Sequence, residues 1–181
     1  GSPGASAIGQ FFFFSLLFGG ADLLYRRFYP HRVALENFLR PSGFMTGEGL
    51  KAIWVGYLVF LVHLGWIIVY YLLGERLNFW CPLGIDNVGV LSATLPFYSA
   101  ISLGLHASAQ EETIARVVAL TLGWRITRNF WVANLMQAMI WAFMHSSYAQ
   151  QPAYARGVEL TIVGLFYGYI MRRYGLLPCF I

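Results

Sequence analysis

The chain has 181 residues, of which 58% are hydrophobic and only 11% are charged. In typical soluble domains roughly 45–50% of residues are hydrophobic and about 25% are charged. The mean hydropathy is +0.59, so this composition argues against a soluble globular protein and predicts an all-α, polytopic transmembrane helical bundle. The net charge of +4 does not indicate nucleic acid as a partner, because the basic residues stand at the ends of apolar runs, where lipid headgroups anchor them.

The sequence divides into three parts. Residues 1–7 resemble a linker or an expression scar and are excluded from the fold prediction. Residues 8–87 are expected to hold N-terminal membrane helices and a basic connector, and residues 88–181 to form the functional core. Six helical segments are predicted, and in chain order they are residues 8–25, 52–74, 88–105, 110–124, 129–145 and 156–171.

The second segment carries the clearest membrane signal. Ala52–Gly74 is an uninterrupted stretch of 23 residues without a formal charge, and about 20 apolar helical residues cross a hydrocarbon core. The connector before it is polar and basic, with a short interfacial helix expected at residues 33–39. A kink is expected at Pro96 and a break at residues 106–109. Loop charges nearly balance between the two faces, so they do not settle the orientation.

Two adjacent carboxylates and an arginine stand at the predicted start of the fourth segment. Glu112 precedes Arg116 by four residues, the favourable order for an ion pair on a helix. That pairing leaves Glu111 free to act as a base. His145 ends the fifth segment, and consecutive helices joined by a short turn pack antiparallel. Glu111 and His145 are therefore expected to meet at one depth, where charged groups usually have a function.

Polar residues on the fifth segment share one helical face. They recur at steps of three, four and four, which implies a wet cavity or a buried hydrogen-bond network. These residues are Asn134, Gln137, Trp141 and His145. Glycines on the sixth segment form an edge of small residues suited to close helix packing, and they are Gly157, Gly164 and Gly168.

Each of these features also has a purely structural interpretation. Glu112 and Arg116 could form an interfacial salt bridge, and His145 could contact a headgroup or the backbone. The side chains of Asn134 and Gln137 could make ordinary hydrogen bonds between helices. His63 stands alone in the second segment and is interpreted as structural.

Two motifs resemble those of the CAAX protease and bacteriocin-processing family of glutamate intramembrane endopeptidases. EETIAR (residues 111–116) is similar to EExxxR, and WAFMH (residues 141–145) is similar to FxxxH with Trp141 in place of Phe. The resemblance covers roughly residues 88–181. It implies that Glu111 activates a water with help from His145, while Glu112 and Arg116 hold the site together.

The same resemblance implies a third motif, HxxxN or HxxxD, that stabilises the oxyanion. We expect this motif to follow Ile181, so that the excerpt by itself is inactive or strongly impaired. The implied partners are a lipid bilayer and a peptide or protein substrate that is lipid-anchored or carries a leader. The implied location is a prokaryotic inner membrane.

No cofactor is expected. Zinc is not favoured, because catalytic zinc normally has three protein ligands and HExxH is missing from the sequence. Cys81 and Cys179 lack the spacing of a metal or disulfide motif. Two other functions stay open. The protein could be an inactive relative that serves as a membrane scaffold or immunity protein. It could also be a small transporter, although the sequence does not show the paired broken helices expected of one.

Overall fold

The computed structural model describes residues 3–32, 40–80 and 92–181, and every regular element in these residues is helical. The all-α prediction is confirmed. The helices are α1 (Pro3–Phe28), α2 (Pro41–Phe44), α3 (Gly47–Glu75), α5 (Pro96–Glu112), η2 (Thr113–Ala119), α6 (Leu120–Thr127), α7 (Phe130–Phe143), α8 (Tyr154–Tyr174) and α9 (Leu177–Phe180). The helix expected at residues 33–39, the beginning of the third segment and Cys81 lie outside the described residues.

One long helix replaces the predicted third and fourth segments. α5, η2 and α6 follow one another without interruption, so the break expected at residues 106–109 is wrong. That stretch, His-Ala-Ser-Ala, contains no glycine or proline to stop a helix. Pro96 begins the helix instead of kinking it, since a proline at the first position has no N–H to leave unsatisfied. Glu111 therefore lies inside a helix and not at its start.

The middle of this long helix, η2, is π-helical. The N–H of Leu120 bonds to the carbonyl of Ala115, five residues back. Short π-helical stretches are rare and are found frequently at functional sites. η2 begins directly after the two glutamates and contains Arg116, so the wide turn lies within the predicted motif.

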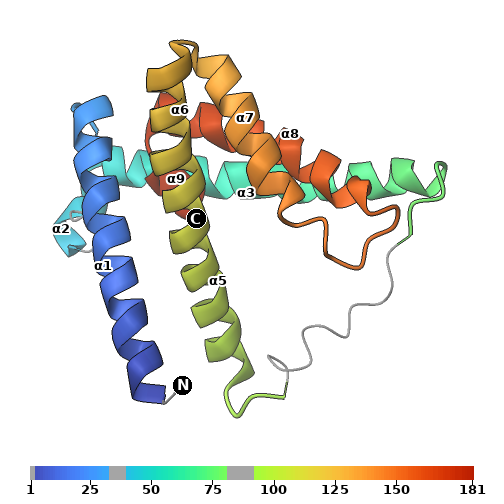
Figure 1. Ribbon diagram of the computed structural model, residues 1–181, viewed down its shortest axis with the longest axis horizontal. Helices are drawn as coiled ribbons and strands as arrows, with labels where there is room; N and C mark the ends of the chain where they lie inside the picture. Colours follow the sequence, from blue (N-terminus) through green and yellow to red (C-terminus); the bar gives the residue numbers. More distant parts are fainter. Residues whose placement is uncertain (1–2, 33–39, 81–91) are drawn as a thin grey trace.

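A tight turn folds α7 back against the long helix. Arg128 ends α6 in the left-handed conformation with φ of 55°. The Asn129 side chain then accepts hydrogen bonds from the N–H groups of Trp131 and Val132, at 2.9 and 3.3 Å, and caps α7. The antiparallel pairing expected from a short connection is confirmed (Figure 1).

Close packing of α7 on α8 depends on glycine. A Cβ atom on Gly168 would lie 1.8 Å from Oδ1 of Asn134, and one on Gly164 would lie 2.9 Å from Cβ of Ala138. Gly157 is equally restricted, by the ring of Phe143 at 2.9 Å. The predicted edge of small residues is therefore confirmed as the contact between these helices.

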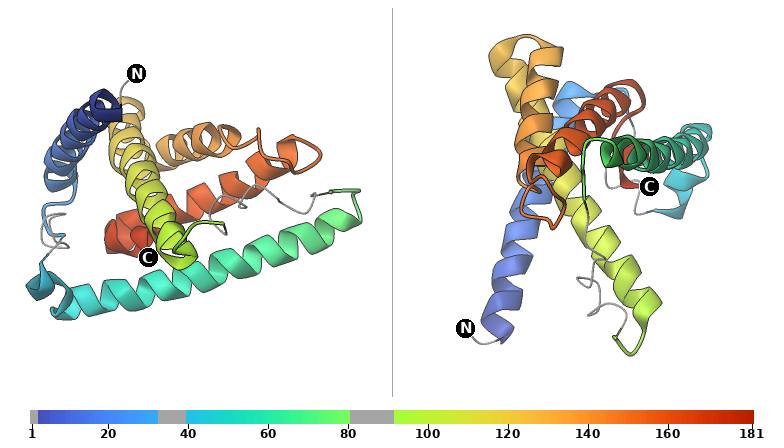
Figure 2. Two further views of the ribbon diagram at one scale, coloured as in Figure 1. Left: turned by 90° about the horizontal axis from the view of Figure 1, so that it is seen from below. Right: turned by 90° about the vertical axis from the view of Figure 1, so that its right-hand side faces the viewer.

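The helices do not form one parallel bundle. α3 and α8 lie side by side and run across α1 and the long helix (Figures 1 and 2). Beyond the end of α3, Trp80 and Gln151 exchange both backbone hydrogen bonds, at 2.8 and 2.6 Å. This bridge fastens the loop after α3 to the loop after α7.

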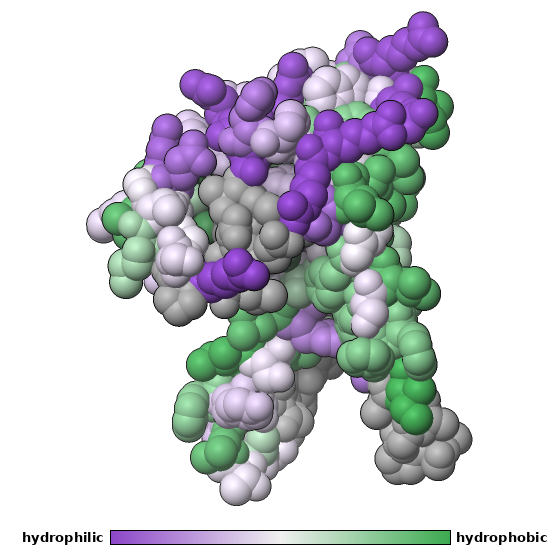
Figure 3. Space-filling model, turned by 90° about the vertical axis from the view of Figure 1, so that its left-hand side faces the viewer, coloured by the Kyte–Doolittle hydropathy of each residue, from purple (hydrophilic) through white to green (hydrophobic). Residues whose placement is uncertain are grey.

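Two of the described helices, residues 8–28 of α1 and α3, are long and apolar enough to cross a membrane, judged by length and composition. Only 11% and 17% of their most apolar windows are buried inside the protein. In Figure 3, hydrophobic side chains cover the projecting parts of α1 and α5, and hydrophilic side chains gather at the other end of that face. The buried core lies where α1, the long helix, α8 and α9 meet.

Candidate active site

Glu111, Trp141 and His145 meet between the long helix and the end of α7. The indole Nε1 of Trp141 donates a hydrogen bond of 2.8 Å to Oε2 of Glu111. Nε2 of His145 lies 3.6 Å from the same oxygen. The structure thus brings together the two residues that the sequence places at one depth, although they are separated by more than thirty positions along the chain.

The backbone sets the orientation of the His145 ring. Nδ1 lies 2.8 Å from the carbonyl oxygen of Trp141, and because a carbonyl only accepts, Nδ1 must carry the proton. In a neutral ring Nε2 is then an acceptor. A separation of 3.6 Å from Glu111 is too long for a direct hydrogen bond. Glu111 and Nε2 therefore form a pair of acceptors that a water molecule can satisfy.

Glu112 and Arg116 occupy a different environment from Glu111. The Glu111 side chain is 36% exposed, while those of Glu112 and Arg116 are 7% and 0% exposed. Arg116 Nε lies 3.2 Å from Glu112 Oε2. The guanidinium carbon lies 4.2 Å from the centre of the Trp141 ring. The ion pair is thus part of the interior and fixes the helix on which Glu111 stands.

The contact between Glu112 and Arg116 does not have the geometry of a hydrogen bond. Within the part of the chain that the structure describes, the nitrogens of Arg116 and Oε2 of Glu112 have no hydrogen-bond partner. The attraction is therefore between charges, and it is strengthened by the low polarity around it.

Asn134 and Gln137 do not face Glu111. The Asn134 amide donates to the carbonyl of Leu165 at 2.9 Å. Gln137 donates to Oδ1 of Asn134 at 2.9 Å and to the carbonyl of Gly164 at 3.2 Å. The sequence allows either a wet cavity or a buried hydrogen-bond network on this polar face. Asn134 and Gln137 form a buried network that joins α7 to α8. Trp141 and His145, one and two turns further along, reach Glu111.

Sequence reasoning missed the contacts that α3 makes with α8. His63 was interpreted as isolated, but its Nδ1 lies 3.2 Å from the hydroxyl of Tyr167. Tyr167 also lies beneath Arg116, with 5.6 Å between the guanidinium carbon and the ring centre. Spacing within one helix gives no signal for a partner 104 positions away.

A second, partly buried ion pair lies along the contact between α3 and α8. Arg156 Nη1 donates to Oε2 of Glu159 at 2.6 Å, and the hydroxyl of Tyr71 donates to the same oxygen at 3.1 Å. Glu159 is fully buried. Its position between α3 and α8 indicates a structural role and separates it from the exposed Glu111.

Metal ligands are sparse around Glu111 and His145. Within residues 3–32, 40–80 and 92–181, no group of three His, Cys, Asp or Glu side chains could hold an ion. Cys179 in α9 is buried, and burial raises the pKa of its thiol. That disfavours the thiolate that a nucleophile or a metal ligand requires.

Comparison with known proteins identifies this half of the chain. A family model described as "Type II CAAX prenyl endopeptidase Rce1-like" matches residues 93–181, a stretch that contains both motifs and all three residues that meet at Glu111. Residues 93–181 match the Rce1-like family. The resemblance seen in the sequence is confirmed, and α3, which packs against this Rce1-like part, lies outside the match.

One curated relative is the sporulation-killing factor biosynthesis protein SkfC of Bacillus subtilis (strain 168). It is 24% identical over 91 residues, which is 50% of this chain and 18% of the relative. The match therefore spans less than a fifth of that relative's length. No solved structure matches the chain.

Proposed function

We propose that the chain is part of an intramembrane endopeptidase in which Glu111 and His145 activate a water molecule that attacks a peptide bond. The observation that carries the proposal is the separation of 3.6 Å between Glu111 Oε2 and His145 Nε2. Two acceptors at this spacing, partly exposed and set in an apolar surface, can hold one water between them.

The proposed reaction begins with the transfer of a proton from this water to Glu111. The water oxygen then forms a bond to the carbonyl carbon of the peptide, and the electron pair of the C=O bond moves to its oxygen. When this intermediate collapses, the C–N bond breaks, and Glu111 returns the proton to the leaving nitrogen. His145 accepts a hydrogen bond from the water through Nε2 and so orients it for attack. No metal ion takes part.

Neighbouring residues give Glu111 and His145 their positions. Trp141 donates to Glu111, and its carbonyl holds the ring of His145, so one residue orients both groups. The guanidinium of Arg116 lies against the ring of this indole. Glu112 balances the charge of Arg116 in the interior. These contacts hold Glu111 and His145 in place before a substrate binds.

We propose a peptide or protein substrate, either lipid-anchored or carrying a leader, cleaved near a membrane surface. Support comes from the family, whose description names prenyl endopeptidases, and from a relative named for the biosynthesis of a killing factor. The exposed apolar surfaces of α1 and α3 favour an integral membrane protein. A prokaryotic inner membrane is the proposed location.

The test is the cleavage of two synthetic substrates by the full natural protein in lipid nanodiscs. One is a farnesylated CAAX peptide and the other is a leader-bearing precursor peptide. Glu111→Gln and His145→Ala should each lower kcat by about 10²- to 10⁴-fold, because the first removes the group that carries the proton and the second removes the group that orients the water. Glu75→Gln removes an exposed carboxylate at the far end of α3 and should leave kcat unchanged. A fully active Glu111→Gln enzyme would exclude the mechanism.

A non-catalytic membrane scaffold is the second candidate, and one observation favours it. The indole of Trp141 already occupies an oxygen of Glu111, a bond that phenylalanine, usual in the resembling motif, could not make. A scaffold requires the helices and the Glu112–Arg116 pair, but it does not require the base. Under this alternative Glu111→Gln would leave partner binding intact, whereas Arg116→Ala would abolish it together with the fold.

A further inference from the structure

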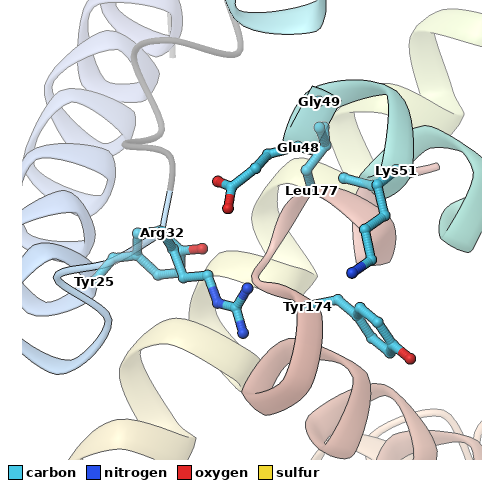
Figure 4. A pocket seen from close by; sticks show the side chains of 8 residues that line it. Tyr25, Arg32, Glu48, Gly49, Lys51, Tyr174 and Leu177 are labelled. Atoms are coloured by element: carbon cyan, nitrogen blue, oxygen red, sulfur yellow. The ribbon is translucent and has the colours of Figure 1, made fainter. Parts of the chain in front are cut away.

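A pocket unrelated to Glu111 lies at the other end of α8. It forms where α1 ends, α3 begins and α8 ends, and Figure 4 shows the side chains that line it. The cavity has a volume of about 60 Å³. Since one water needs about 10–15 Å³ of such space, the cavity has room for about five heavy atoms, the number in one phosphate group.

Donors with positive charge dominate the lining of this pocket. The side chains of Arg32 and Lys51 reach it from two different elements (Figure 4). Arg32 also donates to the backbone carbonyl of Arg173, which positions its guanidinium. The hydroxyl of Tyr25 accepts a hydrogen bond of 3.1 Å from the N–H of Leu176, and this leaves its own proton to donate.

One lining residue opposes an anion. Glu48, in the first turn of α3, also lines the pocket. The positive end of the helix dipole of α3 partly offsets it, although Thr46 caps the N–H of Gly49. With Arg32, Lys51 and Glu48 ionised, the pocket carries a net charge of +1.

The surroundings favour a ligand from the membrane surface. Basic residues occupy the last turns of both adjacent helices, Arg26 and Arg27 on α1 and Arg172 and Arg173 on α8. Hydrophilic side chains gather at this end of the molecule, whereas the projecting part of α1 is apolar (Figure 3). Because the pocket lies beside these basic helix ends, its position fits the level of lipid phosphates.

We propose that this pocket binds a phosphate group through Arg32, Lys51 and Tyr25. The phosphodiester of an anionic phospholipid and free phosphate share this chemistry, and the experiment separates them. The proposal does not depend on peptidase activity, so a Glu111→Gln protein should bind equally well.

The test is calorimetric titration of the detergent-solubilised full protein, in separate arms, with short-chain phosphatidylglycerol, with uncharged diacylglycerol and with inorganic phosphate at constant ionic strength. Arg32→Gln combined with Lys51→Gln should weaken binding at least tenfold, because two charge-assisted contacts are lost. Arg27→Gln removes a cation from the same end but outside the pocket and should change binding less than twofold. Glu48→Gln should tighten it.

Each result decides the proposal or the source of the ligand. Binding of phosphatidylglycerol but not phosphate identifies the lipid, and equal binding of both identifies a soluble phosphate site. Arg32→Lys keeps the charge but not the planar set of donors; it should retain more binding than Arg32→Gln and guards against loss of fold. Equal weakening by Arg27→Gln and by the double variant, or no binding in either phosphate arm, overturns the proposal.

Discussion

Trp141 contacts both halves of the motif that precedes it. Its Nε1 donates to Glu111, while the guanidinium carbon of Arg116 lies 4.2 Å from its ring centre. The resembling family usually has phenylalanine here, and phenylalanine offers a ring face but no donor. The substitution therefore adds one hydrogen bond to an otherwise equivalent aromatic contact.

Replacing Trp141 with Phe should leave an active and folded enzyme. The aromatic face for Arg116 remains, and only the hydrogen bond to Glu111 is lost, so kcat should change by no more than about tenfold. Trp141→Ala removes the ring as well and should lower both activity and the thermal midpoint. Comparing kcat and melting curves of the two variants checks this, and inactivity of a well-folded Trp141→Phe protein would contradict it.

The Glu112–Arg116 pair should be far more costly to break than its sequence spacing implies. Each single change, Glu112→Ala or Arg116→Ala, leaves an uncompensated charge in the interior and should destabilise by about 3–5 kcal/mol. The double change to alanine should cost less than the sum. Arg125→Ala, exposed on α6, is the control and should cost less than about 0.5 kcal/mol. Denaturant unfolding in detergent measures all four, and additive effects would argue against the pairing.

The contacts of a residue could be predicted when its partner lies on a neighbouring helix in the sequence, and not when the partner lies far along the chain. Glu111 and His145 could be brought together because a short turn fixes the pairing of neighbouring helices. His63 could not be assigned a partner, since the sequence does not give the position and rotation of α3 against α8. Asn134 and Gln137 shared a face with His145, but periodicity alone could not distinguish residues facing α8 from those facing Glu111.

Among the elements, the long helix differs most from the prediction. A polar stretch at residues 106–109 was interpreted as a break, although helix continues through residues without strong stop signals. The π-helical turn of η2 was also invisible in the sequence, because TIARVVA has the composition of an ordinary helix. By contrast, the glycine edge of α8 was predictable, since small residues at helical spacing have few other uses in apolar segments.

Adding a methyl group at Gly168 tests this helix contact directly. Gly168→Ala would place Cβ 1.8 Å from Asn134 Oδ1 and should destabilise the protein by about 1–3 kcal/mol. Gly104→Ala on α5 is a matched control, because a Cβ there meets nothing within 4 Å and alanine is the better helix former. Melting temperatures of both variants in one detergent check the prediction, which fails if the two shift equally.

At the scale of the whole molecule, the outer surface matters as much as the core. Large apolar side chains of α3 are exposed along most of its length, among them Trp54, Leu58, Leu61, Ile68 and Leu72. Water would make such a surface prone to aggregation, and lipid would not. The exposed apolar side chains of α3 are therefore typical of a protein surrounded by lipid.

Membrane extraction should show this directly. After expression of the full protein, alkaline carbonate should leave it in the membrane pellet, and a mild non-ionic detergent should release it as a folded species, because apolar contacts with lipid are insensitive to salt and pH. A peripheral protein of the same cells serves as the control and should be released by carbonate. Release of this protein by carbonate would refute membrane integration.

The bridge between Trp80 and Gln151 has a consequence for the loop that follows α7. His145 stands at the beginning of this loop, and the bridge anchors its far part to the end of α3. Any movement of the loop to admit a peptide must therefore be shared with a helix outside the Rce1-like match. The half of the chain outside the match thus restrains this loop, and substitutions there can change its mobility while every motif residue stays the same.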